Sequence, residues 1–517
     1  MNQTTRLWRH GLALFLLALV VRFYSATLIP QPGYMDTAYY TVQAIRLAEG
    51  AGATEPYLWN YLNDPQGIPN PAFGYWMPLP SLLAAPFWAV GHSFLAAQLP
   101  FVLLAALFVL LGAYIAWEST HKLRHFWAAG LLLIASGSVT PFWSLPETFT
   151  PFALCATLCL WAGSRYWLTQ QVRWLLWAVV AAGLAYLTRS DGLLLVALTL
   201  LLPLGRRQGR AFVAAGAALA LLLAPWVLYN LSVHGAPLPT GGTRALWLTN
   251  YDDLFCYHCK LTPANYLAWG WPAILHSKIK AFSTNFMIIV LNVGYLFLAP
   301  FVVIGSWRTH QFLLRWAWLY LALLFAAMTF AFTFPSTRGS LFHSAVALLP
   351  FSVTAALIGL DRTIAWVGQR RKWNINHAQL IFTAATVLIA LLVVTQTSEK
   401  YREWQSAGAL YQPAQAWIAQ QPDAACPVLV GDPASFWYAT RQPALVIPNE
   451  DAKVVAEVAH RYGACWLLLD KNRPKPLADL YQDQQDPVWT LVQQWPDGKL
   501  FRLTDLPGQT AVKNLPR

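Results

Sequence analysis

The sequence predicts an all-α polytopic membrane protein with about eleven transmembrane helices, followed by a small C-terminal α/β domain outside the cytoplasm. Two features of the composition and one change along the chain support this prediction. Hydrophobic residues make up 57% of the 517 residues and charged residues only 11%, whereas a soluble globular protein has about 25% charged residues. Polar residues become frequent again only after Thr395. The composition therefore excludes a disordered chain, a coiled coil and an ordinary soluble enzyme.

Apolar runs long enough to span a bilayer, which takes about 20 residues, recur between residues 11 and 394. The first run, 11–29, has no small-residue cleavage site and contains Arg22, which is typical of a membrane anchor and not of a cleaved signal peptide. Arg22 either extends to the membrane surface or has a function inside the bundle. The other expected spans are 94–117, 126–143, 149–167, 174–187, 193–204, 211–231, 286–306, 312–334, 341–360 and 380–394.

The stretch 174–204 is interrupted by Thr188-Arg189-Ser190-Asp191-Gly192, so it is either one broken helix or a hairpin of two helices. The net charge of +12 can indicate nucleic-acid binding, but the basic residues lie in short clusters between apolar runs. These clusters all fall on one side of the membrane only if 174–204 is a hairpin. The positive-inside rule then places the N-terminus in the cytoplasm and, with an odd number of spans, the C-terminus outside. The segments expected outside are 30–93, 141–148, 188–192, 232–285, 335–340 and everything after 394.

Residues 396–517 are expected to form the α/β domain, because their apolar runs are short and separated by turn residues. The pattern of strand, helix and strand appears in this segment, with a helix that ends at Gly463. Pro496-Asp-Gly-Lys499 fits a hairpin turn between two further strands. The predicted strands are 426–432, 444–448, 465–470, 490–495 and 500–504, and the predicted helix is 451–462.

Two acidic residues stand out in the segments expected outside. Asp36 follows the first span closely, where a carboxylate at the membrane surface is costly unless it is paired or used. Its alternative role is to cap the amphipathic helix expected over 37–49. Glu147 follows Pro146 at the outer start of a span, and its alternative role is that of a first-turn acid favoured by the helix dipole.

Basic residues also gather on the expected outer side. Arg338 precedes an expected helix that contains His343, and a basic group beside a helix N-terminus can hold an anion such as phosphate. The alternative is an interfacial anchor and a core histidine. Arg189 shares a tight turn with Asp191, where the alternative is a simple ion pair. Arg244 and Lys278 are further outer cations.

The six cysteines do not form the dense pattern of a disulfide scaffold. Cys256-Tyr-His-Cys259 lies on the expected outer side, where a local disulfide is favoured over half of a zinc site. Cys426 and Cys465 fall in neighbouring predicted strands, so a bridge between them is one alternative. Cys155 and Cys159 are expected to be packing residues. The sequence contains no Walker loop, no dinucleotide-binding fingerprint, no HExxH and no GxSxG.

Several short motifs occur in one order along the chain. The first span contains Arg22 and is followed by a loop with Asp36; the later motifs are Tyr75-Trp-Met-Pro-Leu-Pro-Ser, Leu187-Thr-Arg-Ser-Asp-Gly192, Ala224-Pro-Trp-Val-Leu-Tyr-Asn230 and residues 338–350. Together they resemble the GT-C superfamily of membrane glycosyltransferases, and most of all its bacterial branch related to protein O-mannosyltransferases and aminoarabinose transferases. The resemblance covers about residues 10–395, so we expect a catalytic domain over 1–395 with 30–93 as its first outer loop.

The resemblance implies an enzyme of the bacterial inner membrane that takes a sugar from a polyprenyl-phosphate donor. The acceptor would be a lipid, a glycan or a protein on the outer face, with no role for nucleic acid. The first-loop acid of such enzymes is catalytic and corresponds to Asp36, and a second acid corresponds to Glu147. Many relatives carry DE or DxD in the first motif, whereas Thr37 and Ala38 follow Asp36 here. We therefore expect no metal, with a divalent cation as the alternative.

The chemistry of such a transfer assigns a role to each candidate. A hydroxyl is a poor nucleophile, so a carboxylate must take its proton as it attacks the anomeric carbon, and we assign this role to Asp36. The leaving phosphate needs positive charge and no proton. Direct displacement then inverts the anomeric carbon, while Glu147 orients Asp36 or the acceptor. The expected phosphate ligands are Arg338, Arg189, Arg244, Lys278 and His343, and the expected donor or acceptor pocket contains Tyr39, Tyr40, Tyr75, Trp76 and Asp191.

Two other functions are consistent with a polytopic chain. A transporter or flippase of a lipid-linked sugar or polymer would also carry interfacial charges, but transporters often contain repeated halves and charges near the bilayer midplane. The chain shows no internal repeat, and its charged motifs gather on one expected face. A non-catalytic assembly protein is the third function, with the C-terminal domain as its binding module. In an enzyme, that domain would either recognise the acceptor or cover the outer face.

Overall fold

The computed structural model describes residues 3–307, 309–483 and 486–504, and it contains two compact units. The first, here called the helical unit, comprises Met1–Pro30, Trp76–Leu238 and Trp271–Arg402. The second, the sheet unit, comprises Gln31–Tyr75, Pro239–Gly270 and Glu403–Arg517. Of the expected C-terminal domain, residues 505–517 lie outside the described residues.

The helical unit confirms the predicted polytopic helical membrane protein. Seven helices in the described residues are long and apolar enough to cross a membrane, or eight if one bent pair is a single span. The bounds of the helices of this unit are α1 Gln3–Thr27, α3 Leu79–Gly91, α4 Phe94–Thr120, α5 Leu123–Ile134, η1 Gly137–Ser144, α6 Phe149–Thr169, α7 Val172–Thr188, η2 Ser190–Gly192, α8 Leu193–Gly205, α9 Gly209–His234, α12 Trp271–Ile288, η5 Ile289–Val293, α13 Ala299–Ser306, α14 Phe312–Ala326, η6 Ala327–Ala331, α15 Thr333–Pro335, η7 Ser336–Ser340, α16 Leu341–Ala345, η8 Val346–Leu348, α17 Leu349–Arg371, α18 Ile375–Val394 and η9 Thr395–Thr397.

The expected span 286–306 is wrong, because the membrane-spanning helix there begins fifteen residues earlier, at Trp271. One face of α12 is apolar and exposed, with Trp271, Leu275, Ile279, Phe282 and Phe286 at helical spacing. The other face is largely buried and polar. A search for continuous apolar runs misses such a helix, since its polar residues interrupt the run.

The segment that follows α12 forms the short separate helix α13, which packs against α17 through two glycines. A Cβ atom on Gly305 would lie 1.8 Å from the carbonyl oxygen of Ala355, and one on Gly359 would lie 1.9 Å from that of Phe301. No larger residue fits at either position without moving a helix. Small residues are the usual means by which membrane helices approach this closely.

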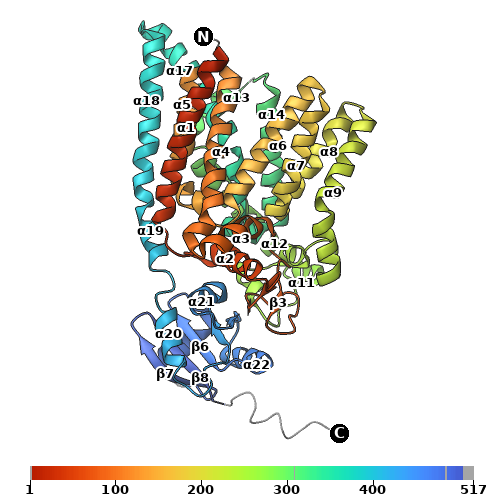
Figure 1. Ribbon diagram of the computed structural model, residues 1–517, viewed down its shortest axis with the longest axis vertical. Coiled ribbons are helices and arrows are strands. Elements are labelled where there is room, and N and C mark those ends of the chain that lie inside the picture. The colour runs from red at the N-terminus through yellow and green to blue at the C-terminus, as the bar shows by residue number, and fades with distance from the viewer. Residues whose placement is uncertain (1–2, 308, 484–485, 505–517) are drawn as a thin grey trace. The chain divides into compact units, whose positions relative to one another are not determined.

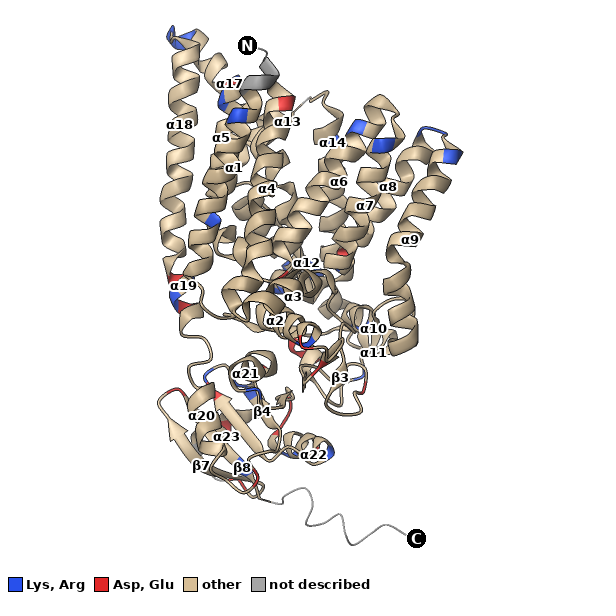
Figure 2. Cartoon of the chain, in the orientation of Figure 1, with Lys and Arg blue, Asp and Glu red and all other residues tan. Residues whose placement is uncertain are grey.

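The interruption at 188–192 confirms the hairpin interpretation, because α7 and α8 are two helices that lie side by side (Figure 1). In the helical unit, Lys and Arg gather near the α8–α9 and α17–α18 turns (Figure 2). Asp361 of α17 pairs there with Lys122 at 2.6 Å and with Arg124 at 2.7 Å. The basic clusters therefore share one end of the unit, as the positive-inside pattern predicts.

Arg22 has a structural role inside the helical unit. The chain bends by 73° between α5 and η1, and this break frees carbonyl oxygens at the C-terminal end of α5. The Nη2 atom of Arg22 donates to the carbonyls of Leu133 at 2.9 Å and Ile134 at 3.0 Å. Its guanidinium also lies 5.6 Å from the ring centre of Trp143. The buried cation thus compensates the negative end of a helix dipole.

The sheet unit is built on a six-stranded sheet with the strand order β2-β5-β4-β6-β8-β7. The first four strands in this order run parallel, and β8 and β7 are antiparallel to their neighbours. The bounds in this unit are α2 Met35–Ala48, β1 Thr54–Glu55, β2 Tyr57–Leu58, β3 Asn70–Pro71, α10 Thr240–Arg244, η3 Ala245–Trp247, η4 Tyr251–Phe255, α11 Pro263–Ala268, α20 Tyr411–Ile418, β4 Val428–Val430, α21 Pro433–Thr440, β5 Ala444–Val446, α22 Ala452–Tyr462, β6 Trp466–Asp470, η10 Lys475–Leu477, α23 Ala478–Asp483, β7 Trp489–Trp495 and β8 Gly498–Leu503; α19 Ser398–Gln405 contains the chain position at which the helical unit passes into the sheet unit.

The units do not follow the expected division at residues 395 and 396, because two outer loops belong to the sheet unit. β2, from the first loop, pairs with β5 of the C-terminal segment. The Tyr61 hydroxyl donates to the carbonyl of Val446, and the Asn449 amide donates to the carbonyl of Phe255 in the second loop at 3.2 Å. Backbone groups of long loops need such partners when they are buried.

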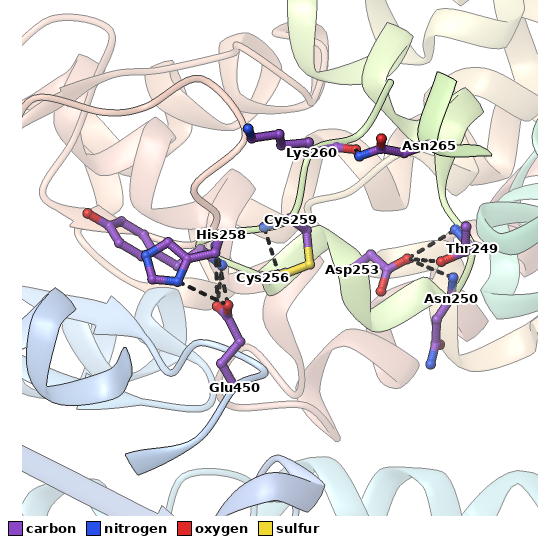
Figure 3. The surroundings of a disulfide bond; sticks show 10 residues. Thr249, Asn250, Asp253, Cys256, His258, Cys259, Lys260, Asn265 and Glu450 are labelled. Atoms are coloured by element: carbon purple, nitrogen blue, oxygen red, sulfur yellow. Dashed lines mark hydrogen bonds and ion pairs between the residues drawn. A yellow bond between two sulfur atoms is a disulfide. The ribbon is translucent and has the colours of Figure 1, made fainter. Parts of the chain in front are cut away.

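Two disulfides lie in the sheet unit. Cys426 and Cys465, which stand just before β4 and β6, are bonded to each other. Cys256 and Cys259 form the expected local disulfide, and Figure 3 shows its surroundings. The backbone amides of Tyr257 and His258 between them donate to the carboxylate of Glu450, so this loop is tied to the C-terminal segment.

A buried carboxyl group holds α2 to its loop within the sheet unit. The Tyr39 hydroxyl donates to Oε1 of Glu55 and accepts from the Phe73 amide, both at 2.9 Å. Glu55 is only 4% exposed. Burial raises its pKa from 4.5 to about 8, although hydrogen bonds from Tyr39 and Asn70 oppose this rise. Glu55 is therefore protonated in the folded protein at neutral pH, where a carboxyl in the unfolded chain is ionised.

We predict that Glu55 makes the sheet unit less stable as the pH rises. The folded protein keeps a proton that the unfolded chain releases above about pH 4.5, so stability is full below that pH and falls until about pH 8. The loss is about 1.4 kcal/mol per pH unit at most. Glu55→Gln keeps the hydrogen-bond acceptor for Tyr39 but does not titrate. The difference in melting temperature, variant minus wild type, should therefore increase from pH 5 to pH 8. If the melting temperatures of the two purified proteins in detergent change with pH in parallel, the prediction is wrong.

Candidate functional site

Three turns meet at the end of the helical unit opposite to its basic clusters. They are the start of α6, the turn between α7 and α8, and the segment formed by η7 and α16. The sequence predicted all three on one side of the membrane, and their contacts confirm that they share one end. Each turn brings at least one of the predicted site residues.

Arg189 connects these three turns. Its Nε donates to Oδ1 of Asp191 at 3.1 Å and to the Ser344 hydroxyl at 3.0 Å. Its Nη2 donates to the Ser340 hydroxyl at 2.7 Å, and its Nη1 approaches the Thr148 hydroxyl at 3.4 Å. The ion pair with Asp191, which was the alternative interpretation of this turn, is present and is one part of a larger network.

Glu147 and His343 lie beside this network. Nδ1 of His343 is 3.6 Å from Oε2 of Glu147 and hydrogen-bonded to the Thr148 hydroxyl at 3.0 Å. The imidazole stacks on Phe149 with ring centres 4.0 Å apart. Glu147 is fully buried. The first-turn interpretation of Glu147 is wrong, because it precedes Thr148, the N-cap of α6.

Glu147 and His343 are residue types that bind transition metals, but a protein site takes three or more ligands. Among the described residues of the helical unit, no third histidine, cysteine or carboxylate completes such a group with them. The helical unit by itself therefore offers a cluster of charges and hydroxyls that can hold an anion or orient a polar ligand.

The two other predicted cations of the helical unit lie on adjacent elements. Lys278 stands on the inward face of α12 and donates to the Thr333 hydroxyl. Arg338 is exposed in the π-helical turn η7. Gly339, which follows it, has a φ of 129°, a value that favours glycine, and it ends the turn before α16.

Asp36 belongs to the sheet unit, where it is the second residue of α2. The capping interpretation is wrong, because the N-cap is Tyr34. A carboxylate in the first turn still interacts favourably with the helix dipole. α2 packs on α21, and Glu49 just after it pairs with Arg441 at 3.6 Å. The helix that carries Asp36 is thus supported by the C-terminal segment.

The predicted aromatic pocket is split between the units. Tyr39 and Tyr40 are each 1% exposed, and the Tyr39 hydroxyl is already hydrogen-bonded to Glu55 and to the Phe73 amide. Tyr75 is half-buried against Trp59, with ring centres 5.1 Å apart.

The Gly241 amide donates to the Gly74 carbonyl at 3.0 Å, which brings α10 and its exposed Arg244 to the Tyr75 segment. Trp76 lies in the helical unit and is half-buried. The candidate residues thus form two groups: Glu147, Arg189, Asp191, Lys278, Arg338, His343 and Trp76 in the helical unit, and Asp36, Tyr39, Tyr40, Tyr75 and Arg244 in the sheet unit.

Sequence reasoning missed the hydroxyl residues that complete the Arg189 network. Ser340 and Ser344 are one helical turn apart, and the Ser344 hydroxyl also donates to Asp191. Thr148 stands next to Glu147. The only sign of these hydroxyl residues in the sequence was that each lies within a few positions of a predicted charged site residue. The π-helical turn η7, which contains Ser340, leaves no pattern in a single sequence.

No family model and no curated protein matches the sequence. Solved structures with a similar fold include ArnT from Cupriavidus metallidurans in the apo state, with a TM-score of 0.55, 15% identity, and coverage of 97% of this chain and 98% of that chain. ArnT from the same organism bound to undecaprenyl phosphate matches with a TM-score of 0.53 and 16% identity, over 95% and 97% of the two chains.

The Archaeoglobus fulgidus oligosaccharyltransferase in complex with Zn and sulfate has a TM-score of 0.55 and 12% identity, over 88% of this chain and 68% of that chain. At such identities the likeness concerns the fold. The chain therefore has the fold of these membrane proteins, and the predicted GT-C-like fold is confirmed.

Proposed function

We propose that this protein is a glycosyltransferase of the inner membrane that moves a sugar from a polyprenyl-phosphate donor to an acceptor hydroxyl on the outer face. The main support is the cluster of Arg189, His343 and Glu147 at one end of the helical unit. A protein of the same fold has been solved with undecaprenyl phosphate bound. The location of the basic clusters at the opposite end supports an outward-facing site and a cytoplasmic N-terminus.

In the proposed reaction, Asp36 takes the proton of the acceptor hydroxyl as its oxygen attacks the anomeric carbon. The bond from that carbon to the phosphate oxygen breaks, and the electron pair leaves with the polyprenyl phosphate. Arg338 is assigned to the leaving phosphate, with Lys278, Arg244, Arg189 and His343 in support. Arg189 is the least free of these, since its N–H groups already bind Asp191 and three hydroxyls.

Glu147 is proposed to orient Asp36 or the acceptor. A buried carboxylate next to a cationic network can hold a hydroxyl group in a fixed direction without itself taking the proton. Attack from the face opposite to the leaving phosphate inverts the anomeric carbon. The proposal does not specify the sugar or the acceptor. The sheet unit is assigned either to cover the outer face or to recognise the acceptor.

We predict that Asp36→Asn lowers turnover by about 10²–10⁴-fold, the usual contribution of a general base, and leaves binding of undecaprenyl phosphate unchanged. The measurement is release of lipid phosphate from a donor, together with lipid affinity of the purified protein. Glu399→Gln is the matched control, because Glu399 is also a first-turn carboxylate and is exposed.

A transporter or flippase would lose little function in Asp36→Asn. Unchanged turnover in this variant would show that Asp36 is not the general base, and the proposed mechanism would be wrong. Loss of lipid binding in the variant, with a normal melting temperature, would instead assign Asp36 to the donor site.

We further propose that catalysis needs no divalent metal, since Thr37 and Ala38 stand where many relatives have a second acid. Turnover should survive treatment with EDTA followed by dialysis. Loss of turnover that Mn²⁺ or Zn²⁺ restores would contradict this and would show that catalysis uses a divalent cation.

A further inference from the structure

A chain of buried and partly buried polar side chains connects α12 to the segment 329–336 inside the helical unit. Lys278 and Asn285 lie two helical turns apart on the inward face of α12, opposite to its exposed apolar stripe. Lys278 donates to the Thr333 hydroxyl, which in turn donates to the Thr329 carbonyl at 3.0 Å. Polar side chains inside a membrane bundle are rare and mark functional regions.

Asn285 binds both ends of this segment. Its Nδ2 donates to the Thr329 hydroxyl at 3.0 Å and to the Ser336 hydroxyl at 3.2 Å. The Ser336 hydroxyl donates onward to the Thr333 carbonyl at 2.8 Å. Asn285, Thr329 and Ser336 are all fully buried, so these hydrogen bonds do not compete with bulk water.

The residues that Asn285 contacts belong to two π-helical turns, η6 and η7. Single π-turns inside helices are rare and concentrate at functional sites. Ser336 is the first residue of η7, and Arg338 stands two positions later in the same turn. The hydrogen bond from Asn285 therefore sets the position of the backbone that presents Arg338.

Packing alone does not account for an asparagine at this position. Its Oδ1 atom is buried and accepts no hydrogen bond from any described residue. A buried unpaired carbonyl is unfavourable, and an apolar side chain of the same size would avoid this cost. The two hydrogen bonds that the amide donates fix the positions of Thr329 and Ser336 relative to α12.

We propose that Asn285 is a positioning residue that holds the η7 turn so that Arg338 faces the phosphate of the lipid donor. This inference rests on the proposed function. Asn285 does not touch the donor itself and acts only through Arg338. Lys278 donates to Thr333 of the same segment, and this second contact keeps α12 in register with residues 329–336.

A double-mutant cycle tests whether Asn285 acts through Arg338. The affinity of the purified full-length protein for undecaprenyl phosphate is measured in detergent for the wild type, Asn285→Ala, Arg338→Ala and the double variant. We expect Asn285→Ala to weaken binding about tenfold, and the double variant to bind no more weakly than Arg338→Ala alone. With a donor, the effect of Asn285→Ala should appear in KM and leave kcat nearly unchanged.

Ser283→Ala is the matched control, since Ser283 is exposed on α12 and its hydroxyl donates to the Lys280 carbonyl, one turn earlier in the same helix. This variant should bind as the wild type does. Ser336→Ala removes the same contact from the other side, so it replaces Asn285→Ala in the cycle if that variant does not fold.

The outcomes separate this inference from the proposed function. A wild-type protein that neither binds undecaprenyl phosphate nor uses any donor would overturn both. Suppose that Arg338→Ala weakens binding but Asn285→Ala does not, or that the double variant loses affinity by the product of the two single losses. In either case the proposed function stands and the positioning role of Asn285 is wrong. An Arg338→Ala variant that binds normally would also overturn the inference.

Discussion

The end of the helical unit opposite to its basic clusters depends on the hydrogen bonds of one guanidinium group, that of Arg189. The bilayer offers no water to unpaired polar groups, so a cation at the end of a hairpin must find its partners within the protein. Arg189 finds them in three turns, through Asp191 of its own turn, Thr148 before α6, and Ser340 and Ser344 of the η7–α16 segment. The α7–α8 hairpin, the start of α6 and the η7–α16 segment therefore meet at one place. Arg22 follows the same constraint through its Nη2 atom, which donates to two carbonyls that the bend between α5 and η1 frees.

Much of this architecture follows from composition and periodicity. The spans, the hairpin at 188–192, the common side of the outer turns and the strands after residue 425 were predictable, because burial in a bilayer or in a sheet imposes long apolar runs or short apolar strands. The start of α12 at Trp271 was not predictable, because an amphipathic span with Lys278 and Asn285 on its inward face has no continuous apolar run. The pairing of β2 with β5 was also hidden, because a two-residue strand carries no pattern and its partner lies nearly four hundred residues away.

The candidate site shows the same limit. Charged residues at predicted span ends are visible in a sequence, and Glu147, Arg189 and His343 do come together. Their hydroxyl partners and the asparagine behind η7 are common residue types, and only the backbone path makes them part of a site. Tyr39 illustrates the converse: an aromatic residue near a catalytic candidate is, in the structure, an anchor for Glu55. The proposed reaction assigns the leaving phosphate to cations of the helical unit and the base to Asp36 of the sheet unit.

The central claim is that these parts serve transfer of a sugar from a lipid-borne phosphate. The most direct measurement is incubation of the purified protein with a panel of radiolabelled polyprenyl-phosphate sugars and candidate acceptors, with release of the lipid phosphate as the readout. The account predicts that at least one donor releases its lipid phosphate in step with the appearance of label in an acceptor. No release from any donor in the presence of acceptors, by a folded protein, would contradict it.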